Sequence, residues 1–439
     1  MTAFDRFDHR LAASLDDLAA PTYPDYCDDV LEQATRRAQR PAWTFLERWL
    51  PMSTVTRRNV FAPTFPYRTV MLLLAVLALL IAAMAISFGM RPDLKPAPPF
   101  GRAANGTISY SIDGDIYARE LGGGAQRLLV GGPARDINPT FSRDGTRLAF
   151  FRVTDDPAAT ATDSMLVANA DGTDARVLIG PTTIVTALWS PDSTELAVIT
   201  EEGGHQILSI VGVAQAAAPR TIDLPVNLAD EVDWRPPDGD ELIFRGEQGS
   251  LFAIYAIRPD GSGFRQITGE LNSDHFWGTY ALSPDGKELA YVNGGDRVET
   301  HVLNLDSGED RLWGAALPPF ADGFTGLSHW GSPVYSADGT RFVFGRYWGE
   351  NDGTLNHQVF VATVASDGAD AVPIGEVHRS QSGHNPFGYG FAPDDTAVLI
   401  QDIDVLKTWL ADPAGGDPQP LDWGELLDPP TWQRLPPSP

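Results

Sequence analysis

The chain has 439 residues, of which 43% are hydrophobic and 21% are charged, so most of it is able to bury a core. The whole net charge of -26 lies after residue 90, because residues 1–68 carry nine arginines and nine acidic residues, which balance. So acidic a surface argues against nucleic acid or anionic lipid as a partner, since both need clusters of Lys and Arg. The single cysteine, Cys27, excludes a disulfide framework within the chain.

Residues 1–68 are predicted to form a short helical tail. Apolar residues recur at helical spacing from Phe4 to Leu18, and a second stretch, from Asp25 to Gln39, has an acidic start and a basic end. Two helices of this size cannot bury a full core alone. We expect either a partly ordered tail whose Trp-bearing segment, 41–51, lies at the membrane surface, or a docking segment for a cytoplasmic partner.

The segment from Val70 to Ser87, VMLLLAVLALLIAAMAIS, contains no charge, proline or glycine. About 20 such residues in a helix cover the roughly 30 Å hydrocarbon core of a bilayer. We therefore predict one transmembrane helix over residues 69–90, rather than a buried core helix or a signal peptide. Basic residues flank it evenly, so the positive-inside rule does not decide its orientation.

We expect an integral protein of the bacterial inner membrane, with a cytoplasmic N-terminus and the large acidic part outside. Residues 91–103 contain four prolines and are predicted to form a semi-rigid linker. The remaining residues, 104–439, are predicted to form one domain.

A unit repeats within residues 104–439. Each copy has an aromatic residue or leucine, then Ser-Pro-Asp-Gly or a variant of it, then a short apolar strand. The first positions of the six copies lie 45 to 56 residues apart, at Phe141, Trp189, Trp234, Leu282, Tyr335 and Phe391. Pro-Asp-Gly favours a tight turn in which glycine supplies a positive φ, and a period of this length is typical of propeller blades of four strands.

The two ends of this domain complement each other. Residues 107–129 read as three strands without the repeated first segment, and residues 430–434 read as an isolated first strand. Pairing them would form a further blade and remove exposed strand edges. The sequence therefore predicts an all-β, seven-bladed β-propeller closed by pairing of its N- and C-terminal strands, with six blades as the alternative.

These repeats resemble the TolB-like, or WD-repeat-like, β-propeller family over residues 104–435. The resemblance implies the fold, but it implies little about function, because such propellers serve as protein-binding platforms, sensors and accessory domains of peptidases. The order of tail, span and outer domain is also similar to that of membrane-bound anti-sigma factors. The zinc-binding version of their N-terminal module needs a His-x3-Cys-x2-Cys cluster, and this chain has only Cys27.

The segments before the last three repeats, 269–280, 314–333 and 375–390, are long and rich in histidine and aromatic residues. We predict that they are loops on one face of the propeller and form a site for a protein, peptide or cell-envelope ligand. The candidate residues are His275, Trp277, His329, Trp330, His384 and Tyr389. Two alternatives are that these loops plug the central channel, or that the three histidines bind zinc, for which no local spacing signature exists.

Enzyme motifs are scarce. The nearest match to Gly-x-Ser-x-Gly, residues 326–330, fails at its last position, and no phosphate or dinucleotide loop is present. The leading hypothesis is a membrane-anchored binding module without catalytic activity, cofactor or metal. A transmembrane regulator whose tail holds a cytoplasmic factor is the second hypothesis. A glycoside hydrolase that uses two of the many carboxylates is the third.

Overall fold

The computed structural model describes residues 71–77, 97–121, 123–153, 163–214, 218–271, 280–293, 299–317, 328–330, 333–349, 355–380, 387–402, 406–426 and 428–436. The chain divides into two compact units, Met1–Arg91 and Pro92–Pro439. Each unit is described by itself below.

In the first unit the described residues are 71–77, which are helical with exposed apolar side chains. Within the described residues no helix reaches the length and hydrophobicity that a bilayer crossing requires. The rest of the predicted span 69–90 and the whole predicted tail 1–68 lie outside the described residues. Both stay predictions.

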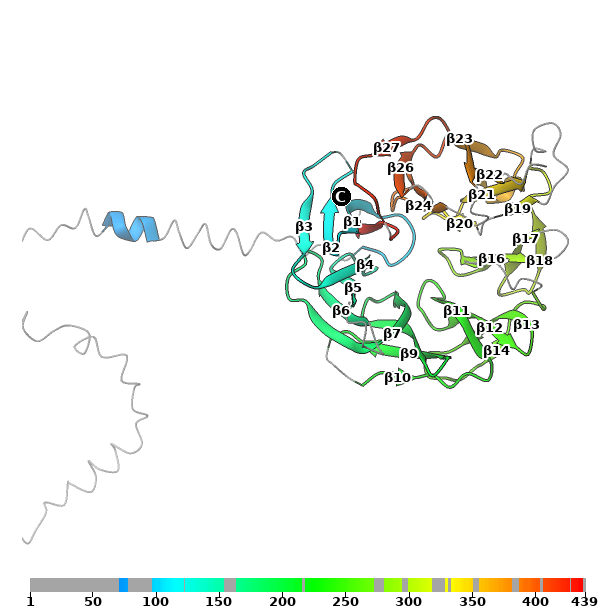
Figure 1. Ribbon diagram of the computed structural model, residues 1–439, viewed down its shortest axis with the longest axis horizontal. Helices are drawn as coiled ribbons and strands as arrows, with labels where there is room; N and C mark the ends of the chain where they lie inside the picture. The colour runs from blue at the N-terminus through cyan, green and yellow to red at the C-terminus, as the bar shows by residue number, and fades with distance from the viewer. Residues whose placement is uncertain are drawn as a thin grey trace, which may run out of the picture. The chain divides into compact units, whose positions relative to one another are not determined.

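The second unit is all-β, and its antiparallel sheets are arranged around a common centre (Figure 1). One sheet joins the two ends of the unit, in the order β28-β1-β2-β3. Its strands are β1 (Ala104–Ile112), β2 (Asp115–Arg119), β3 (Arg127–Val130) and β28 (Thr431–Leu435). Strand β28 pairs with β1 so that Ser109 lies opposite Thr431, and the two hydroxyl oxygens are 2.9 Å apart.

The next sheet has seven strands because the 14-residue strand β7 serves two groups of strands. The first part of β7 pairs with β6 and its second part pairs with β8. The strands are β4 (Arg135–Phe141), β5 (Arg147–Val153), β6 (Asp163–Asn169), β7 (Arg176–Trp189), β8 (Glu195–Glu202), β9 (His205–Gly212) and β10 (Arg220–Thr221).

Four further sheets follow in chain order. The first has β11 (Asn227–Trp234), β12 (Leu242–Gln248), β13 (Leu251–Ile257) and β14 (Arg265–Gln266). The second has β15 (Tyr280–Leu282), β16 (Glu288–Asn293), β17 (Glu299–Asn304) and β18 (Asp310–Trp313). The third has β19 (Ser328–Trp330), β20 (Val334–Tyr335), β21 (Arg341–Gly349), β22 (Leu355–Thr363) and β23 (Val372–Ser380), with a 3-10 turn, η4 (Val364–Ser366), between the last two. The fourth has β24 (Phe387–Phe391), β25 (Val398–Asp402), β26 (Lys407–Ala411) and β27 (Gln419–Leu421).

The repeated Ser-x-Asp-Gly segments form the tight turns that the sequence predicts. In the β15–β16 turn, Ser283 Oγ donates to Asp285 Oδ1 at 2.7 Å and accepts from the Glu288 backbone N–H at 2.9 Å. Gly286 has φ +67°, a conformation that favours glycine. We call the side of the second unit that carries these turns the turn side. It comprises 142–146, 190–194, 235–240, 283–287, 336–340 and 392–396.

Neighbouring turns contact one another around the centre. The contacts are Asp144 N–H to Ser193 Oγ at 3.0 Å, Arg235 Nε to Gly286 O at 2.9 Å, Asp338 N–H to Asp395 Oδ2 at 3.0 Å and Gln433 Nε2 to Gly145 O at 2.7 Å. The last of these contacts connects the C-terminal strand β28 to the β4–β5 turn. The repeat therefore organises one side of the unit as a continuous series of turn-to-turn contacts.

The core lies between neighbouring sheets. The aromatic residues that open two repeats join their own group of strands to the preceding group. Trp189 Nε1 donates to Thr140 O within the seven-stranded sheet, and Trp234 Nε1 donates to Leu188 O of the preceding sheet, both at 3.1 Å. The last and first sheets also share a core, in which Leu399 packs with Ile108 and Tyr110. Buried apolar clusters therefore hold adjacent groups of strands together, as expected for the blades of a propeller.

Candidate functional site

The predicted site residues are only partly within the described structure. His275, Trp277 and His384 lie outside the described residues. His329 and Trp330 lie in β19, opposite Tyr347 and Arg346 of β21 in the backbone register. Tyr389 lies in β24, opposite Ile400 of β25. Whether the six side chains converge stays a prediction.

The predicted loops 314–333 and 375–390 differ from the structure in one respect. Residues 372–380 form strand β23, and 387–391 form β24, so much of the second segment is extended strand. The reason is the long β21–β22 hairpin, whose strands pair over nine residues each and give β23 a partner as far as Ser380. Long backbone ladders therefore replace part of the irregular loop that the composition suggested.

Polar side chains are buried where this hairpin and strand β25 end, on the side opposite the turn side. The strands β21 and β25 begin just after the turns 336–340 and 392–396, so their far ends lie across the unit from those turns. Six residues form what we call the polar cluster: Arg346, Asn356, His357, His378, Gln401 and Asp402. Apart from His378, each is at most 5% exposed.

The polar cluster spans two sheets. His357 lies opposite His378 in the β22–β23 ladder, and His378 Nδ1 is 3.8 Å from Asp402 Oδ2 of β25. Gln401 Nε2 donates to Leu426 O at 2.9 Å and to Asp428 O at 3.2 Å. Burial lowers the pKa of the Arg346 guanidinium to about 10, which leaves it charged at neutral pH. Burying such groups costs free energy unless they are paired, and each member of the polar cluster has at least one interaction partner.

A cavity of about 340 Å³ lies beside the polar cluster, between β22–β23 and β25–β26. Its polar walls are His378, Glu376 and Asp417, and its apolar walls include Trp409 and Ile400. The Trp409 ring meets the His378 ring edge-on at 5.6 Å. A volume of this size suits a small ligand or one side chain of a larger partner. Two carboxylates, an imidazole and an indole favour a polar or cationic group.

A metal site is not seen in this part of the chain. Within the described residues no group of three His, Cys, Asp or Glu side chains is placed to hold a metal ion. The three histidines of the zinc alternative, His275, His329 and His384, have side chains that the structure does not describe. That alternative stays untested.

His378, Trp409, Asp402 and Arg346 are not among the six candidate residues predicted from the sequence. One signal was available, because the β21 strand RFVFGRYWG continues past its apolar half into arginine, tyrosine and tryptophan. The facing strand β22, LNHQVFVAT, begins with an equally polar half. In each of these two strands one half is apolar and the other half is polar. The polar half marks the end of the strand that carries the polar cluster.

Comparisons with known proteins agree with the fold. No protein-family model matches the chain. It is 29% identical over 131 residues to the protein TolB homolog of Chlorobium luteolum, which covers 29% of this chain and 28% of that protein. It is also 29% identical over 114 residues to an uncharacterized protein of Agrobacterium fabrum, covering 26% of this chain and 38% of the relative. The alignments span about a third of the length of these curated relatives.

Solved structures to which the chain is similar include TolB from Acinetobacter baumannii, with a TM-score of 0.43 at 17% identity over 74% of this chain and 81% of that chain. Puromycin hydrolase has a TM-score of 0.47 at 17% identity over 75% of this chain and 54% of its own. A putative dipeptidyl aminopeptidase IV from Bacteroides ovatus has a TM-score of 0.44 at 14% identity, covering 72% and 52%. The TolB similarity in sequence and the arrangement of the sheets support a TolB-like β-propeller.

Proposed function

We propose that this TolB-like β-propeller binds a protein, peptide or cell-envelope ligand and performs no catalysis. The observation that carries the proposal is the cavity beside His378 and Trp409, together with the polar cluster below it. Such a cavity supplies one aromatic wall and several hydrogen-bonding groups, which is the usual composition of a recognition site. The predicted loop residues His275, His329 and His384 would extend this site.

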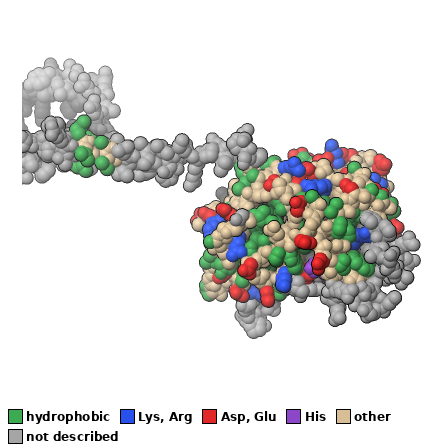
Figure 2. Space-filling view, turned by 90° about the horizontal axis from the view of Figure 1, so that it is seen from above, with side chains coloured by type: hydrophobic (Ala, Val, Ile, Leu, Met, Phe, Trp, Pro, Cys, Tyr) green, Lys and Arg blue, Asp and Glu red, His purple; other side chains and the backbone are tan. Residues whose placement is uncertain are grey.

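The finer architecture is part of the proposal. Counting β7 once in each of its two groups of strands gives seven blades, and the β28–β1 pairing closes the ring. Six blades remain the alternative. Figure 2 supports an acidic module that does not bind nucleic acid, because basic side chains lie singly or in small groups on the face shown.

Membrane anchoring by residues 69–90 belongs to the same proposal, with the N-terminus in the cytoplasm and the propeller outside it. Extraction of membranes with alkaline carbonate tests the anchor. If residues 69–90 span the membrane, the full chain should stay in the membrane pellet. Phosphatase fusions at the two ends test the orientation, with activity expected only at the C-terminus. The second hypothesis, a regulator whose tail holds a cytoplasmic factor, predicts that residues 1–68 retain such a factor and release it when the propeller is occupied.

Binding is tested with the full chain in detergent and a set of defined probes, namely envelope peptides and cell-wall glycan fragments. His378→Ala and Trp409→Ala should each weaken binding of the recognised probe by about tenfold or more, which is roughly 1.4 kcal/mol. His205→Ala, an exposed histidine of β9, is the matched control and should leave affinity unchanged. Equal affinity of all three variants and wild type would remove the site.

One feature of the cavity keeps a glycoside hydrolase as a second candidate. Both Glu376 and Asp417 line it, and glycosidases use a pair of carboxylates as acid and base or nucleophile. Hydrolysis of chromogenic glycosides by wild type, with loss in both Glu376→Gln and Asp417→Asn, would establish this reaction. The absence of turnover across a broad glycoside panel would leave binding alone.

A further inference from the structure

The seven residues before β1 are packed against the turn side of the propeller. We call this segment, Ala97–Ala103, the strap. Ala97 and Ala103 are each 3% exposed, although the sequence predicted this stretch as the end of a free-standing linker. The backbone N–H of Ala103 donates to Pro393 O at 2.8 Å. The strap is therefore part of the propeller's surface on the turn side.

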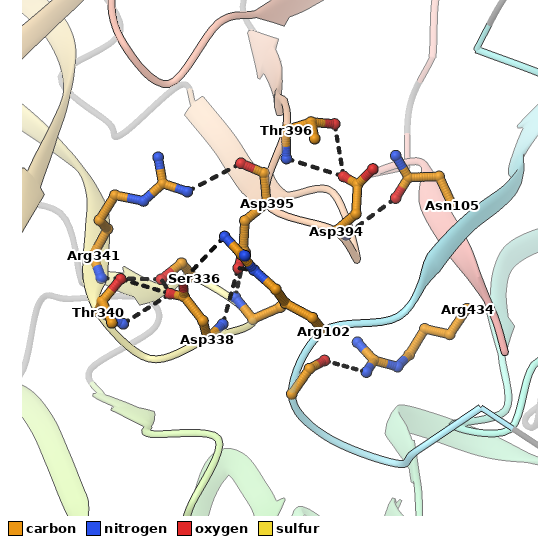
Figure 3. Close-up of polar contacts among 12 residues, drawn as sticks. Arg102, Asn105, Ser336, Asp338, Thr340, Arg341, Asp394, Asp395, Thr396 and Arg434 are labelled. Atoms are coloured by element: carbon orange, nitrogen blue, oxygen red, sulfur yellow. Dashed lines mark hydrogen bonds and ion pairs between the residues drawn. The ribbon is translucent and has the colours of Figure 1, made fainter. Parts of the chain in front are cut away.

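One contact clamps the strap to two neighbouring turns (Figure 3). Arg102 Nε donates to Asp395 Oδ2 at 3.0 Å, and Arg102 Nη2 lies 3.1 Å from Asp338 Oδ2. The Asp395 side chain is fully buried and also accepts the backbone N–H groups of Ala337 and Asp338, at 2.5 and 3.0 Å. Removing a partner of a buried carboxylate destabilises the folded protein. The Arg102 contact therefore contributes more to folding stability than an ion pair between two exposed side chains.

A second contact joins the strap to an arginine of the innermost strand β28. Arg434 Nη2 donates to Pro98 O at 3.1 Å and also to Gly101 O, and Figure 3 shows Arg434 reaching the strap. The Arg143 guanidinium lies over the Phe100 ring, 4.8 Å from its centre. Two backbone carbonyls of the strap thus accept hydrogen bonds from Arg434, and one ring of the strap lies against Arg143.

Arg143 and Arg434 line a cavity of about 180 Å³, together with Trp189 and Trp432. Within the described residues no carboxylate lies in ion-pair distance of Arg434, and Asp233 Oδ1 is 4.0 Å from Arg143 Nη2. Arg434 Nε and Trp432 Nε1 are buried N–H donors without an acceptor in the described part of the chain. Burial, and then the neighbouring Arg143, lower the pKa of Arg434 to about 10. Two guanidinium groups therefore line this cavity of a strongly acidic protein, and two of its lining residues have an N–H group without an acceptor among the described residues.

We infer that this cavity is a carboxylate-binding site whose two arginines are engaged by the protein's own strap. Guanidinium groups bind carboxylates through two parallel hydrogen bonds, and Trp432 Nε1 adds a third donor. The carbonyl oxygens of Pro98 and Gly101 accept hydrogen bonds from Arg434 Nη2, a group that an acidic ligand would also use. A carboxylate ligand and the strap therefore compete, and the apparent affinity is reduced by the fraction of closed molecules. The site lies on the turn side, apart from the proposed ligand site at His378.

Binding of succinate, a small dicarboxylate, tests the inference by calorimetry with the full chain in nonionic detergent at constant ionic strength. Arg102→Gln opens the clamp without touching the cavity and should tighten binding by about threefold or more. Arg434→Gln and Arg143→Gln should each weaken it by about tenfold or more. Arg220→Gln is the matched control, because its side chain is 54% exposed, close to the 59% of Arg102, and faces Glu195 at 4.0 Å. It should leave affinity within about twofold, as should His378→Ala.

Trypsin provides an independent readout of the strap. Arg91 and Lys95 precede prolines, which trypsin does not cleave, so the bond after Arg102 reports on the segment between residue 91 and the propeller. Succinate should accelerate this cleavage in wild type, whereas sodium chloride of equal ionic strength should not. The inference would be overturned if Arg434→Gln and Arg143→Gln both bound succinate with wild-type affinity. It would also be overturned if succinate did not alter the rate of trypsin cleavage after Arg102. Loss of probe binding in His378→Ala would bear only on the proposed function.

Discussion

The turn side and the opposite side of the propeller follow different rules. On the turn side, four of the six repeats contribute the same Ser-x-Asp turn, and neighbouring turns bond to one another. On the opposite side, two sheets extend beyond the common pattern and bury the polar cluster. A regular repeat suits stability, because each unit supports the next one. We propose that departure from the repeat marks the side on which recognition is built, since a repeated contact offers no means to discriminate one ligand from another.

The largest expected effect is a difference in folding stability between alanine variants of two tryptophans, one from each side. Trp189 is 2% exposed and joins the two groups of strands of the seven-stranded sheet through its Nε1 hydrogen bond to Thr140 O. Trp189→Ala should lower the free energy of unfolding by about 3–5 kcal/mol, from lost burial and the cavity it leaves. Trp409→Ala, at the partly exposed cavity wall, should cost less than about 2 kcal/mol. Chemical denaturation of the full chain measures both, and equal losses would contradict the division into a structural and a binding side.

The turn-to-turn contacts are tested next with a pair of glycines. A Cβ at Gly145, where φ is +72°, would come within 1.9 Å of the Arg434 carbonyl oxygen of β28. Gly145→Ala should therefore destabilise the protein by about 2–4 kcal/mol, from backbone strain and displacement of β28. Gly261→Ala is the control, because Gly261 has φ +86° and open space around it. It should cost about 1 kcal/mol, and similar melting temperatures for the two variants would argue against tight turn packing.

A smaller effect is expected from a single turn hydroxyl. Ser283 is 4% exposed, and its Oγ both donates to Asp285 and accepts from Glu288 N–H. Ser283→Ala should cost about 1–2 kcal/mol, because it leaves a backbone N–H without its acceptor. Ser307→Ala, in the exposed β17–β18 turn, should cost less than half as much. Unfolding by urea compares them, and the reverse order would show that the repeated turns are not special.

The smallest effect is a pH dependence that belongs to the turn side. Burial raises the pKa of Asp285, whereas hydrogen bonds from Ser283 and Lys287 lower it by more, so the net shift is downward. Asp192, Asp338 and Asp394 shift in the same direction for the same reasons. Between the lowered and the ordinary pKa the unfolded chain binds more protons, so stability is full above about pH 4 and falls as the solution is acidified below it.

Urea midpoints from pH 3 to pH 7 test this dependence. We expect a plateau down to about pH 4.5 and a decline below it. The variant Asp285→Asn should show a shallower decline than wild type. A midpoint that rises on acidification would contradict the downward shifts.

Much of the propeller could be predicted because its information is local. The Ser-x-Asp-Gly segments specify turns through side chains two to five residues apart, such as Ser336 with Asp338 and Arg341. The apolar triplets next to these turns become the most buried strands, as Leu242–Phe244 shows. The candidate site was harder, because His378 meets Asp402 only when two separate sheets pack side by side. No spacing along the chain encodes that contact.

By itself the sequence determined an all-β repeat, its turn positions and the acidic character of its surface, because these follow from short-range hydrogen bonding, periodic apolar residues and charge. Only the tertiary structure decided that Arg102 of the supposed linker is clamped by Asp338 and Asp395, and that Arg143 and Arg434 share one cavity. Arg102 and Asp395 are 293 residues apart in the chain. Contacts at such separation depend on how all the intervening sheets pack, and this is why composition and spacing could not show them.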